Sequence, residues 1–170
     1  MSPGMRSWRS PFRVNFVSIA MRAQLDQTKD GQASREPRLG CGAAVVNDGR
    51  LLLIHRRREP EADHWGLPGG KVDWLEPVEH AIRREIREEL GISLGELHLL
   101  CVVDQIDPSR ATHWAAPVFL TLQFEGTPAL IEPDKHAAWG WFALDRLPEP
   151  LTMATRTAAL HLRQRFASAH

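Results

Sequence analysis

The strongest constraint on the fold lies in residues 66–92, which read GLPGGKVDWLEPVEHAIRREIREELGI. Proline suits the first position of a helix and glycine the residue just past its end, so a helix is predicted from about Pro77 to Leu90, with Gly91 as the stop. Its apolar residues recur every four positions and form one stripe, made of Val78, Ile82, Ile86 and Leu90. The stripe predicts a helix that packs one face against a core.

The same helix carries a group of acids, Glu85, Glu88 and Glu89. Residues three and four positions apart are neighbours on a helix, and each like-charged pair at this spacing costs roughly 0.2–0.5 kcal/mol. At about 100° per residue, Glu89 falls inside the apolar stripe, Glu85 beside it and Glu88 on its shoulder. Ionised carboxylates in a packed face are costly unless they are paired or bound to a metal.

Two interpretations of these acids are open. In the first, this is a charged surface helix with Glu–Arg pairs, although most of its arginines fall on the opposite side and only Arg84 is placed to reach Glu88. In the second, the acids form a cage for Mg²⁺, which prefers oxygen ligands and shares its shell with waters and phosphate oxygens. A cation there would neutralise charge developing at phosphorus and supply an activated water. The angular placement favours the cation.

The loop before the helix fits a cation site. Gly69 and Gly70 allow the backbone to approach a ligand closely, so a carbonyl there can be a further metal ligand. Lys71 adds a positive charge near a bound diphosphate. The segment is not a P-loop, because no glycine stands five residues before Gly70 and Val72 takes the place of the required Ser or Thr.

The remaining elements are predicted from apolar runs and turn signals. Strands are expected at 39–46, 50–57, 96–106, 113–126 and 138–144, a loop at 59–70, and a closing helix at 152–167 with Thr152 as its N-cap. This order predicts one mixed α/β domain over residues 39–168. Residues 1–38 are expected to be a flexible N-terminal extension. Its apolar stretch, residues 14–20, is too short and too polar to span a membrane, and no clear secretory cleavage site follows.

Composition limits the class of partner. The chain has 21 basic and 21 acidic residues, so no overall field attracts a membrane surface or a long nucleic acid. Cys41 and Cys101 cannot make a disulfide framework and do not form a metal-binding CxxC pair. A reducing, cytoplasmic setting is expected.

The fixed positions of residues 70–92 resemble the complete Nudix box. Gly70 is followed after five residues by Glu76, and seven residues later by Arg84-Glu85-Ile86-x-Glu88-Glu89-x-Gly91-Ile92. The likeness extends from about Leu39 to Leu160. It implies a Nudix fold of the α/β class, with a mixed β-sheet sandwiched between helices (an α/β/α sandwich). It also implies hydrolysis of a nucleoside diphosphate linked to another group X, with Mg²⁺ or Mn²⁺ bound.

The resemblance implies a role for each matching residue. Glu85, Glu88, Glu89 and the Gly69 carbonyl would bind the metal, with one glutamate serving as base. Arg84 and Glu76 would orient the glutamates. Outside the box, residues 132–142, EPDKHAAWGWF, resemble a segment of triphosphate-cleaving members. There Glu132 matches an additional glutamate that joins the metal site or acts as base. An equally favoured alternative is that Glu132 is an ordinary acid of a loop, exposed to solvent and without a role in the site.

Four further residues are candidates for binding substrate, each with a structural alternative. Arg56 and Lys71 can contact phosphate, although the arginine run 56–58 also fits a solvated charge run. Trp65 can stack on a base or pack its loop. His113 stands near where a substrate could lie but also fits an ordinary, partly exposed histidine.

The function expected is Mg²⁺-dependent hydrolysis of a (deoxy)nucleoside triphosphate to the monophosphate and pyrophosphate. One alternative is hydrolysis of ADP-ribose or another nucleotide sugar. An alternative of a different class is a nucleotide-sensing Nudix module without catalysis. The expected partner is a small nucleotide rather than a long nucleic acid or a membrane, and the resemblance admits a homodimer.

Overall fold

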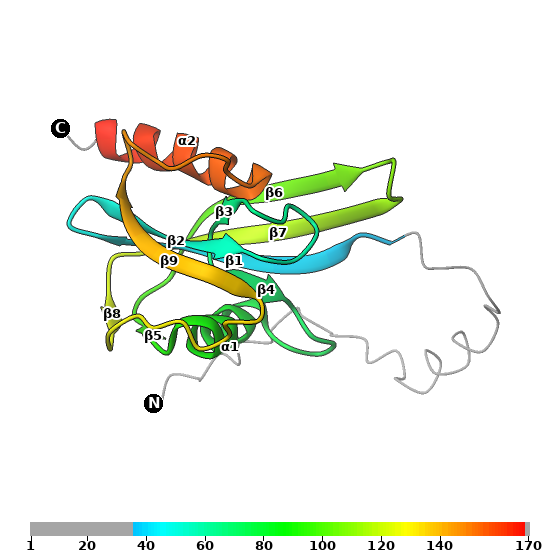
Figure 1. Ribbon diagram of the computed structural model, residues 1–170, viewed down its shortest axis with the longest axis horizontal. Helices are drawn as coiled ribbons and strands as arrows, with labels where there is room; N and C mark the ends of the chain where they lie inside the picture. Colours follow the sequence, from blue (N-terminus) through cyan, green and yellow to red (C-terminus); the bar gives the residue numbers. More distant parts are fainter. Residues whose placement is uncertain (1–35, 169–170) are drawn as a thin grey trace, which may run out of the picture. The chain divides into compact units, whose positions relative to one another are not determined.

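The computed structural model describes residues 36–168 (Figure 1). The elements in chain order are β1 (Arg38–Asn47), β2 (Arg50–Arg56), β3 (Trp65–Gly66), β4 (Gly69–Lys71), α1 (Val78–Leu90), β5 (Ser93–Leu94), β6 (His98–Asp107), β7 (Thr112–Thr121), β8 (Phe124–Glu125), β9 (His136–Ala143) and α2 (Met153–Ala167). The predicted extension at 1–38 lies almost wholly outside the described residues, so it stays a prediction.

The main sheet is mixed and is built around β1. Its strand order is β3-β2-β1-β7-β6, while β4 also pairs with β1 and β9 with β2. Strands β1 and β7 run parallel, and the other pairs in this sheet are antiparallel. Strands β5 and β8 form a separate antiparallel pair.

A helix covers each face of this sheet, with α1 and α2 on opposite sides (Figure 1). Ala43 and Val45 of β1 pack in the core beneath α1. Ala44 and Val46 point the other way, into the core beneath α2. Since successive side chains of a strand point to opposite faces, a strand covered on both sides reads as a continuous apolar run, as β1 does. The predicted α/β/α sandwich is confirmed.

Both helices begin and end where the sequence signals them. Helix α1 follows Pro77 and stops at Gly91, whose φ of 68° is the left-handed conformation that glycine adopts without strain. The Thr152 side chain caps α2 by accepting a hydrogen bond from the Thr155 N–H. Among the described residues, no helix has the length and apolar character needed to cross a membrane.

Two predicted boundaries differ from the structure. The loop expected at 59–70 contains β3 and the start of β4. The strand expected at 113–126 is divided into β7 and β8, because the Thr121 hydroxyl hydrogen-bonds the carbonyl and the N–H of Gln123. Such local side-chain bonds compete with the strand ladder and turn the chain.

Candidate functional site

Helix α1 places the acids at three different depths. Ala81, Ile82, Ile86 and Leu90 are fully buried against the sheet. Glu89 lies among them with only 4% of its surface exposed. Glu85 is partly buried and Glu88 is exposed, which is the order predicted from their angles around the helix.

Arg84 ties together the acids on the outer side of this helix. Its Nε and one terminal nitrogen donate to the two carboxylate oxygens of Glu76, each at 2.9 Å. Its other terminal nitrogen donates to Glu85 at 2.8 Å and to Glu88 at 3.2 Å. The paired guanidinium lowers the pKa of Glu76 to about 2. In turn, the hydrogen bonding of Arg84 to the Glu76 carboxylate is the main cause that raises the pKa of Arg84.

This arrangement corrects one sequence expectation. The crowding of Glu85 and Glu88 is relieved by Arg84, which lies between their carboxylates, so a cation is not the sole means of tolerating these two acids. The structure thus combines the two interpretations left open by the sequence. Arg84 pairs with Glu85 and Glu88. Glu89 lies instead in the buried face of the helix.

Strand β4 holds two glycines against these acids. A Cβ on Gly70 would meet the Glu85 carboxyl carbon at 2.4 Å, and a Cβ on Gly69 would meet the Cys41 carbonyl oxygen at 2.2 Å. Gly69 also has a φ of 145°, which L side chains rarely adopt. Its N–H donates to a carboxylate oxygen of Glu89 at 2.8 Å. Gly69 is therefore required by its backbone conformation and by the closeness of the β1 backbone, whereas Gly70 leaves the space that the Glu85 carboxylate occupies.

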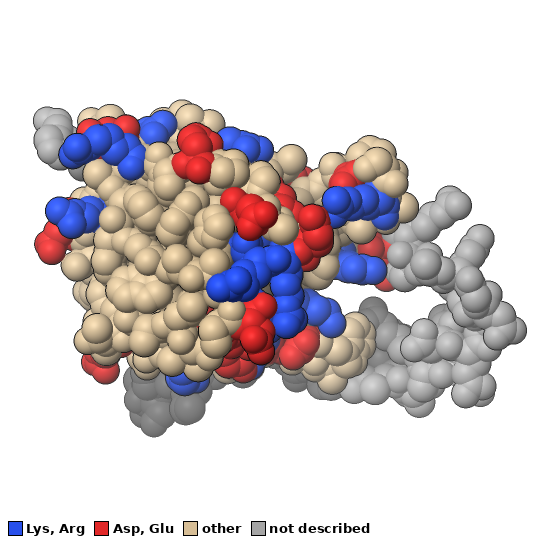
Figure 2. Space-filling model, viewed as in Figure 1, with Lys and Arg blue, Asp and Glu red and all other residues tan. Residues whose placement is uncertain are grey.

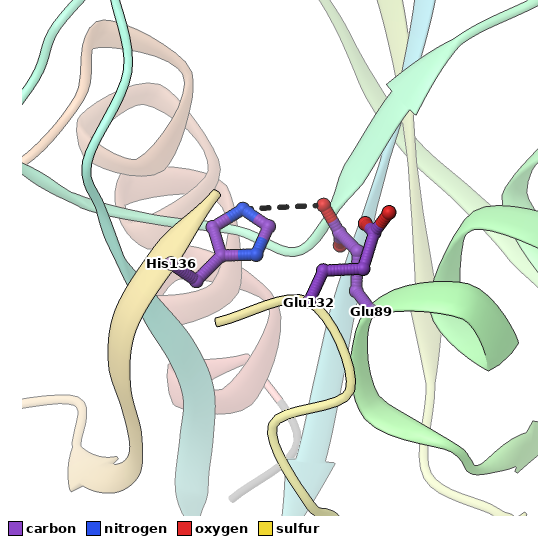
Figure 3. A group of neighbouring side chains, drawn as sticks. All are labelled: Glu89, Glu132 and His136. Atoms are coloured by element: carbon purple, nitrogen blue, oxygen red, sulfur yellow. Dashed lines mark ion pairs between the residues drawn. The ribbon is translucent and has the colours of Figure 1, made fainter. Parts of the chain in front are cut away.

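Glu89 faces Glu132, in the segment before β9, and His136, the first residue of β9 (Figure 3). Glu89, Glu132 and His136 each offer one ligand atom, and these atoms lie within 4.8 Å of one another. Burial is the main cause that raises the pKa of Glu89, to about 8, and that lowers the pKa of His136 to about 4. The imidazole is therefore neutral near pH 7 and gives the buried acid no positive charge. Within the described residues, this is the group of acids and histidines compact enough to share a metal ion.

A cavity of about 220 Å³ opens on the other side of β4. Its lining includes Gly69 to Lys71 of β4, Gly40 to Gly42 of β1, and Arg56 and Trp114. The guanidinium of Arg38 lies over the Trp114 ring, 5.6 Å from its centre. The cavity thus brings basic and aromatic groups to the strand that contacts the acids.

Of the four predicted substrate residues, Arg56 and Lys71 line the cavity. Trp65 does not. Its ring packs on His55 and Phe142, with ring centres 5.0 and 4.8 Å away, which is the packing alternative. His113 is also outside the cavity lining, and its Nε2 lies 3.5 Å from Asp104 on the neighbouring strand.

Comparisons with known proteins show the family of this chain. The family model of the NUDIX domain matches residues 36–163. The chain belongs to the NUDIX family. A crystal structure of a MutT NUDIX hydrolase from Burkholderia pseudomallei is 64% identical, with a TM-score of 0.74 over 75% of this chain and 98% of that one. The resemblance to the Nudix family seen in the box is thus confirmed, and this structural relative is a Nudix hydrolase of the MutT type.

Curated relatives of this Nudix chain are named for nucleotide hydrolysis. An oxidized purine nucleoside triphosphate hydrolase of Danio rerio is 34% identical over 104 residues, which cover 61% of this chain and 65% of the relative, just under two thirds. An ADP-ribose pyrophosphatase of Methanocaldococcus jannaschii is 32% identical over 141 residues, covering 81% and 82%. These names support the predicted enzyme class, a nucleotide pyrophosphohydrolase.

Sequence reasoning missed two residues of this candidate site. Trp114 lines the cavity, whereas its neighbour His113 was selected. Neighbouring residues of a strand point to opposite faces, and the sequence does not show which of these two faces the cavity. His136 was missed as a ligand candidate, although its position four residues after Glu132 was visible in EPDKH.

Proposed function

We propose that this Nudix protein hydrolyses a (deoxy)nucleoside triphosphate to the monophosphate and pyrophosphate, with Mg²⁺ as its metal. One observation carries the proposal. Strand β4 has the carboxylates of α1 on one side and the cavity with Arg56 and Trp114 on the other. A nucleotide with its base near the aromatic ring would extend its phosphates past the edge of β4 that lies away from β1, and so reach the acids.

The acids of this site fit a divalent cation, and Nudix hydrolases use one. Glu132 has a buried carboxylate oxygen without a hydrogen-bond partner, and Glu89 is buried beside a neutral imidazole. Oxygen-rich sites of this kind suit hard cations. We assign the metal to Glu85, Glu88, Glu89 and the Gly69 carbonyl. A bound divalent ion supplies charge neutralisation at the phosphates and lowers the pKa of a bound water.

The remaining groups orient the reactants. Arg84 and Glu76 hold Glu85 and Glu88 in fixed directions, so that their oxygens need not reorganise when a cation arrives. Lys71 and Arg56 bind phosphate oxygens. A carboxylate next to the attacking water accepts its proton, and this role belongs either to Glu132 or to a glutamate of the box. Glu132 is suited to it because one of its oxygens is already paired with Lys135 at 2.7 Å while the other is free.

The test is a substrate panel with purified protein and Mg²⁺. Triphosphates should release pyrophosphate, whereas ADP-ribose, the alternative favoured by the Methanocaldococcus relative, should release AMP and ribose 5-phosphate. Absence of turnover with both groups would refute the proposal. A pure nucleotide sensor is the alternative of another class, and Glu88→Gln discriminates, because a sensor has no turnover to lose.

The partner is a small nucleotide. On the face shown in Figure 2, basic side chains gather in a short central band with acidic side chains beside it. A long nucleic acid would need a continuous basic surface, and the net charge of zero provides none. A cytoplasmic location and a homodimer are parts of this proposal, to be tested by fractionation and by light scattering.

A further inference from the structure

A second cavity adjoins the one described above. It has a volume of about 290 Å³, and its lining shares four residues with the first cavity, namely Pro60, Glu61, Gln105 and Trp114. Among the described residues that line it, none is basic. The basic groups Arg56 and Lys71 line the first cavity instead. Phosphates therefore belong in the first cavity, and the second suits an uncharged group.

Gln105 and Trp114 lie together where the two cavities meet. They stand directly opposite each other on the antiparallel strands β6 and β7. Side chains of opposed residues lie on the same face of a sheet and come close together. Within the described part of the chain, the Gln105 amide makes no hydrogen bond. An aromatic ring and an amide with free donors and acceptor are thus available side by side.

Glu61 is fixed in the wall that the cavities share. One of its carboxylate oxygens accepts a hydrogen bond at 2.7 Å from the N–H of Met153, the first residue of α2. Two residues earlier, Glu59 pairs at 2.9 Å with Arg110, in the turn between β6 and β7. The loop is therefore held at both α2 and the hairpin. The second carboxylate oxygen of Glu61 has no partner among the described residues.

A helix-capping role explains only part of the Glu61 environment. It accounts for the oxygen that bonds Met153 but not for the free one. The φ of Glu61 is 59°, a left-handed conformation that is unfavourable for a residue with a side chain and is found mostly at functional sites. The other acid of the second cavity, Asp107, is occupied within its own turn by the N–H groups of Ser109 and Arg110. Glu61 is thus the acid that can accept a hydrogen bond from a ligand.

We propose that Glu61 and Gln105 bind the edge of the nucleotide base, and that this protein prefers bases with an amino group beside an unprotonated ring nitrogen, as in adenine and cytosine. Glu61 accepts from the amino group and Gln105 donates to the ring nitrogen, while the base stacks on Trp114. The inference rests on the nucleotide substrate proposed above and adds the kind of base that it carries.

The carboxylate makes this contact selective. Hypoxanthine and uracil carry an oxo group in place of the amino group and a hydrogen on the neighbouring ring nitrogen. An ionised carboxylate only accepts hydrogen bonds, so the oxo group would face Glu61 with two acceptors together. Gln105 can turn its amide to suit either edge, because an amide both donates and accepts. Glu61 therefore sets the preference, and Gln105 strengthens binding.

The experiment measures binding of nucleoside monophosphates to the full-length protein with Mg²⁺, by isothermal titration calorimetry. Monophosphates have no diphosphate bridge to cleave, so the result does not depend on turnover. The pairs AMP with IMP and CMP with UMP differ at the edge in question. The variants are Glu61→Gln, which keeps an oxygen for the Met153 N–H, and Gln105→Leu. The matched control is Asp63→Asn, because Asp63 is an exposed acid of the same loop outside both linings.

Wild type and Asp63→Asn should bind AMP more tightly than IMP, and CMP more tightly than UMP, by at least about 5-fold, the size of one good contact to a base edge. In Glu61→Gln both ratios should fall to about 1, because the new amide can accept or donate. Gln105→Leu should bind AMP and CMP at least about 5-fold more weakly than wild type, and this variant provides the test if Glu61→Gln does not fold.

The two proposals fail in different ways. Equal affinities within each pair in wild type, unchanged ratios in Glu61→Gln, or unchanged affinities in Gln105→Leu would overturn this inference and leave the proposed hydrolysis standing. The expected ratios in a protein that hydrolyses no nucleotide would support the inference and refute only the reaction. Absence of binding of all four monophosphates would overturn the inference.

Discussion

Replacing Arg84 by lysine should loosen the carboxylates of α1 while keeping the positive charge. In the structure Arg84 makes five hydrogen bonds, two to Glu76 and one each to Glu85, Glu88 and the Lys71 carbonyl. The planar guanidinium spans these acceptors because its donors point in different directions. A lysine ammonium carries three donors at a single point and cannot reach all of them.

The expected size follows from these contacts. Glu85 and Glu88 would keep a nearby positive charge but lose their fixed orientation. Loss of a group that orients metal ligands typically lowers metal affinity or activity by about 10–100-fold. We therefore expect Arg84→Lys to weaken divalent-cation binding within this range, with little change in helix content because α1 is held by its buried stripe.

Isothermal titration calorimetry with Mg²⁺ and with Mn²⁺ measures the affinity, and circular dichroism checks the fold. Arg87→Lys is the matched control. Arg87 is exposed on the same helix, and the same substitution is made there on the side that faces away from the acids. Metal affinity in Arg84→Lys equal to that of wild type would refute the role given to the guanidinium. An equal loss in both variants would point to the helix as a whole instead.

Three further outcomes are expected. Gly70→Ala should displace the Glu85 carboxylate, which lies 2.4 Å from the position of the new Cβ, and turnover measured with Mg²⁺ should fall together with metal affinity. Trp114→Ala should raise the KM for nucleotides with kcat nearly unchanged if the ring stacks on the base, because such stacking contributes about 1–3 kcal/mol; equal KM values would refute that contact. Burial raises the pKa of the Cys41 thiol from 9.0 to about 11. The unfolded chain loses this proton first, so the stability contributed by the group is complete below pH 9 and is lost between pH 9 and 11, as urea unfolding at several pH values would measure.

The sequence was sufficient for features with a local physical cause. The stripe of α1 and its ends at Pro77 and Gly91 follow from helix periodicity and backbone conformation, so they agree with the structure. The order of burial among Glu85, Glu88 and Glu89 also follows from angle alone.

Features that depend on tertiary contacts could not be predicted from the sequence in the same way. Arg84 reaches Glu76 only because the segment before α1 folds back beside it. The same guanidinium also pairs with Glu85 and Glu88, the crowded acids for which the sequence favoured a metal. The meeting of Glu89 with His136 depends on how the segment before β9 crosses the end of α1. No local sequence pattern indicates that a histidine at the start of a strand will contact a glutamate of a distant helix.

The thinness of β4 has a consequence for how the two sides of the site influence each other. The strand is three residues long, Gly69–Lys71, and its N–H at Gly69 touches Glu89 while the same residues line the cavity. Any movement of this peptide layer by a nucleotide also moves a donor to a carboxylate. Any change that occupancy on one side makes in the affinity of the other would then be the same factor in both directions, as thermodynamic linkage requires.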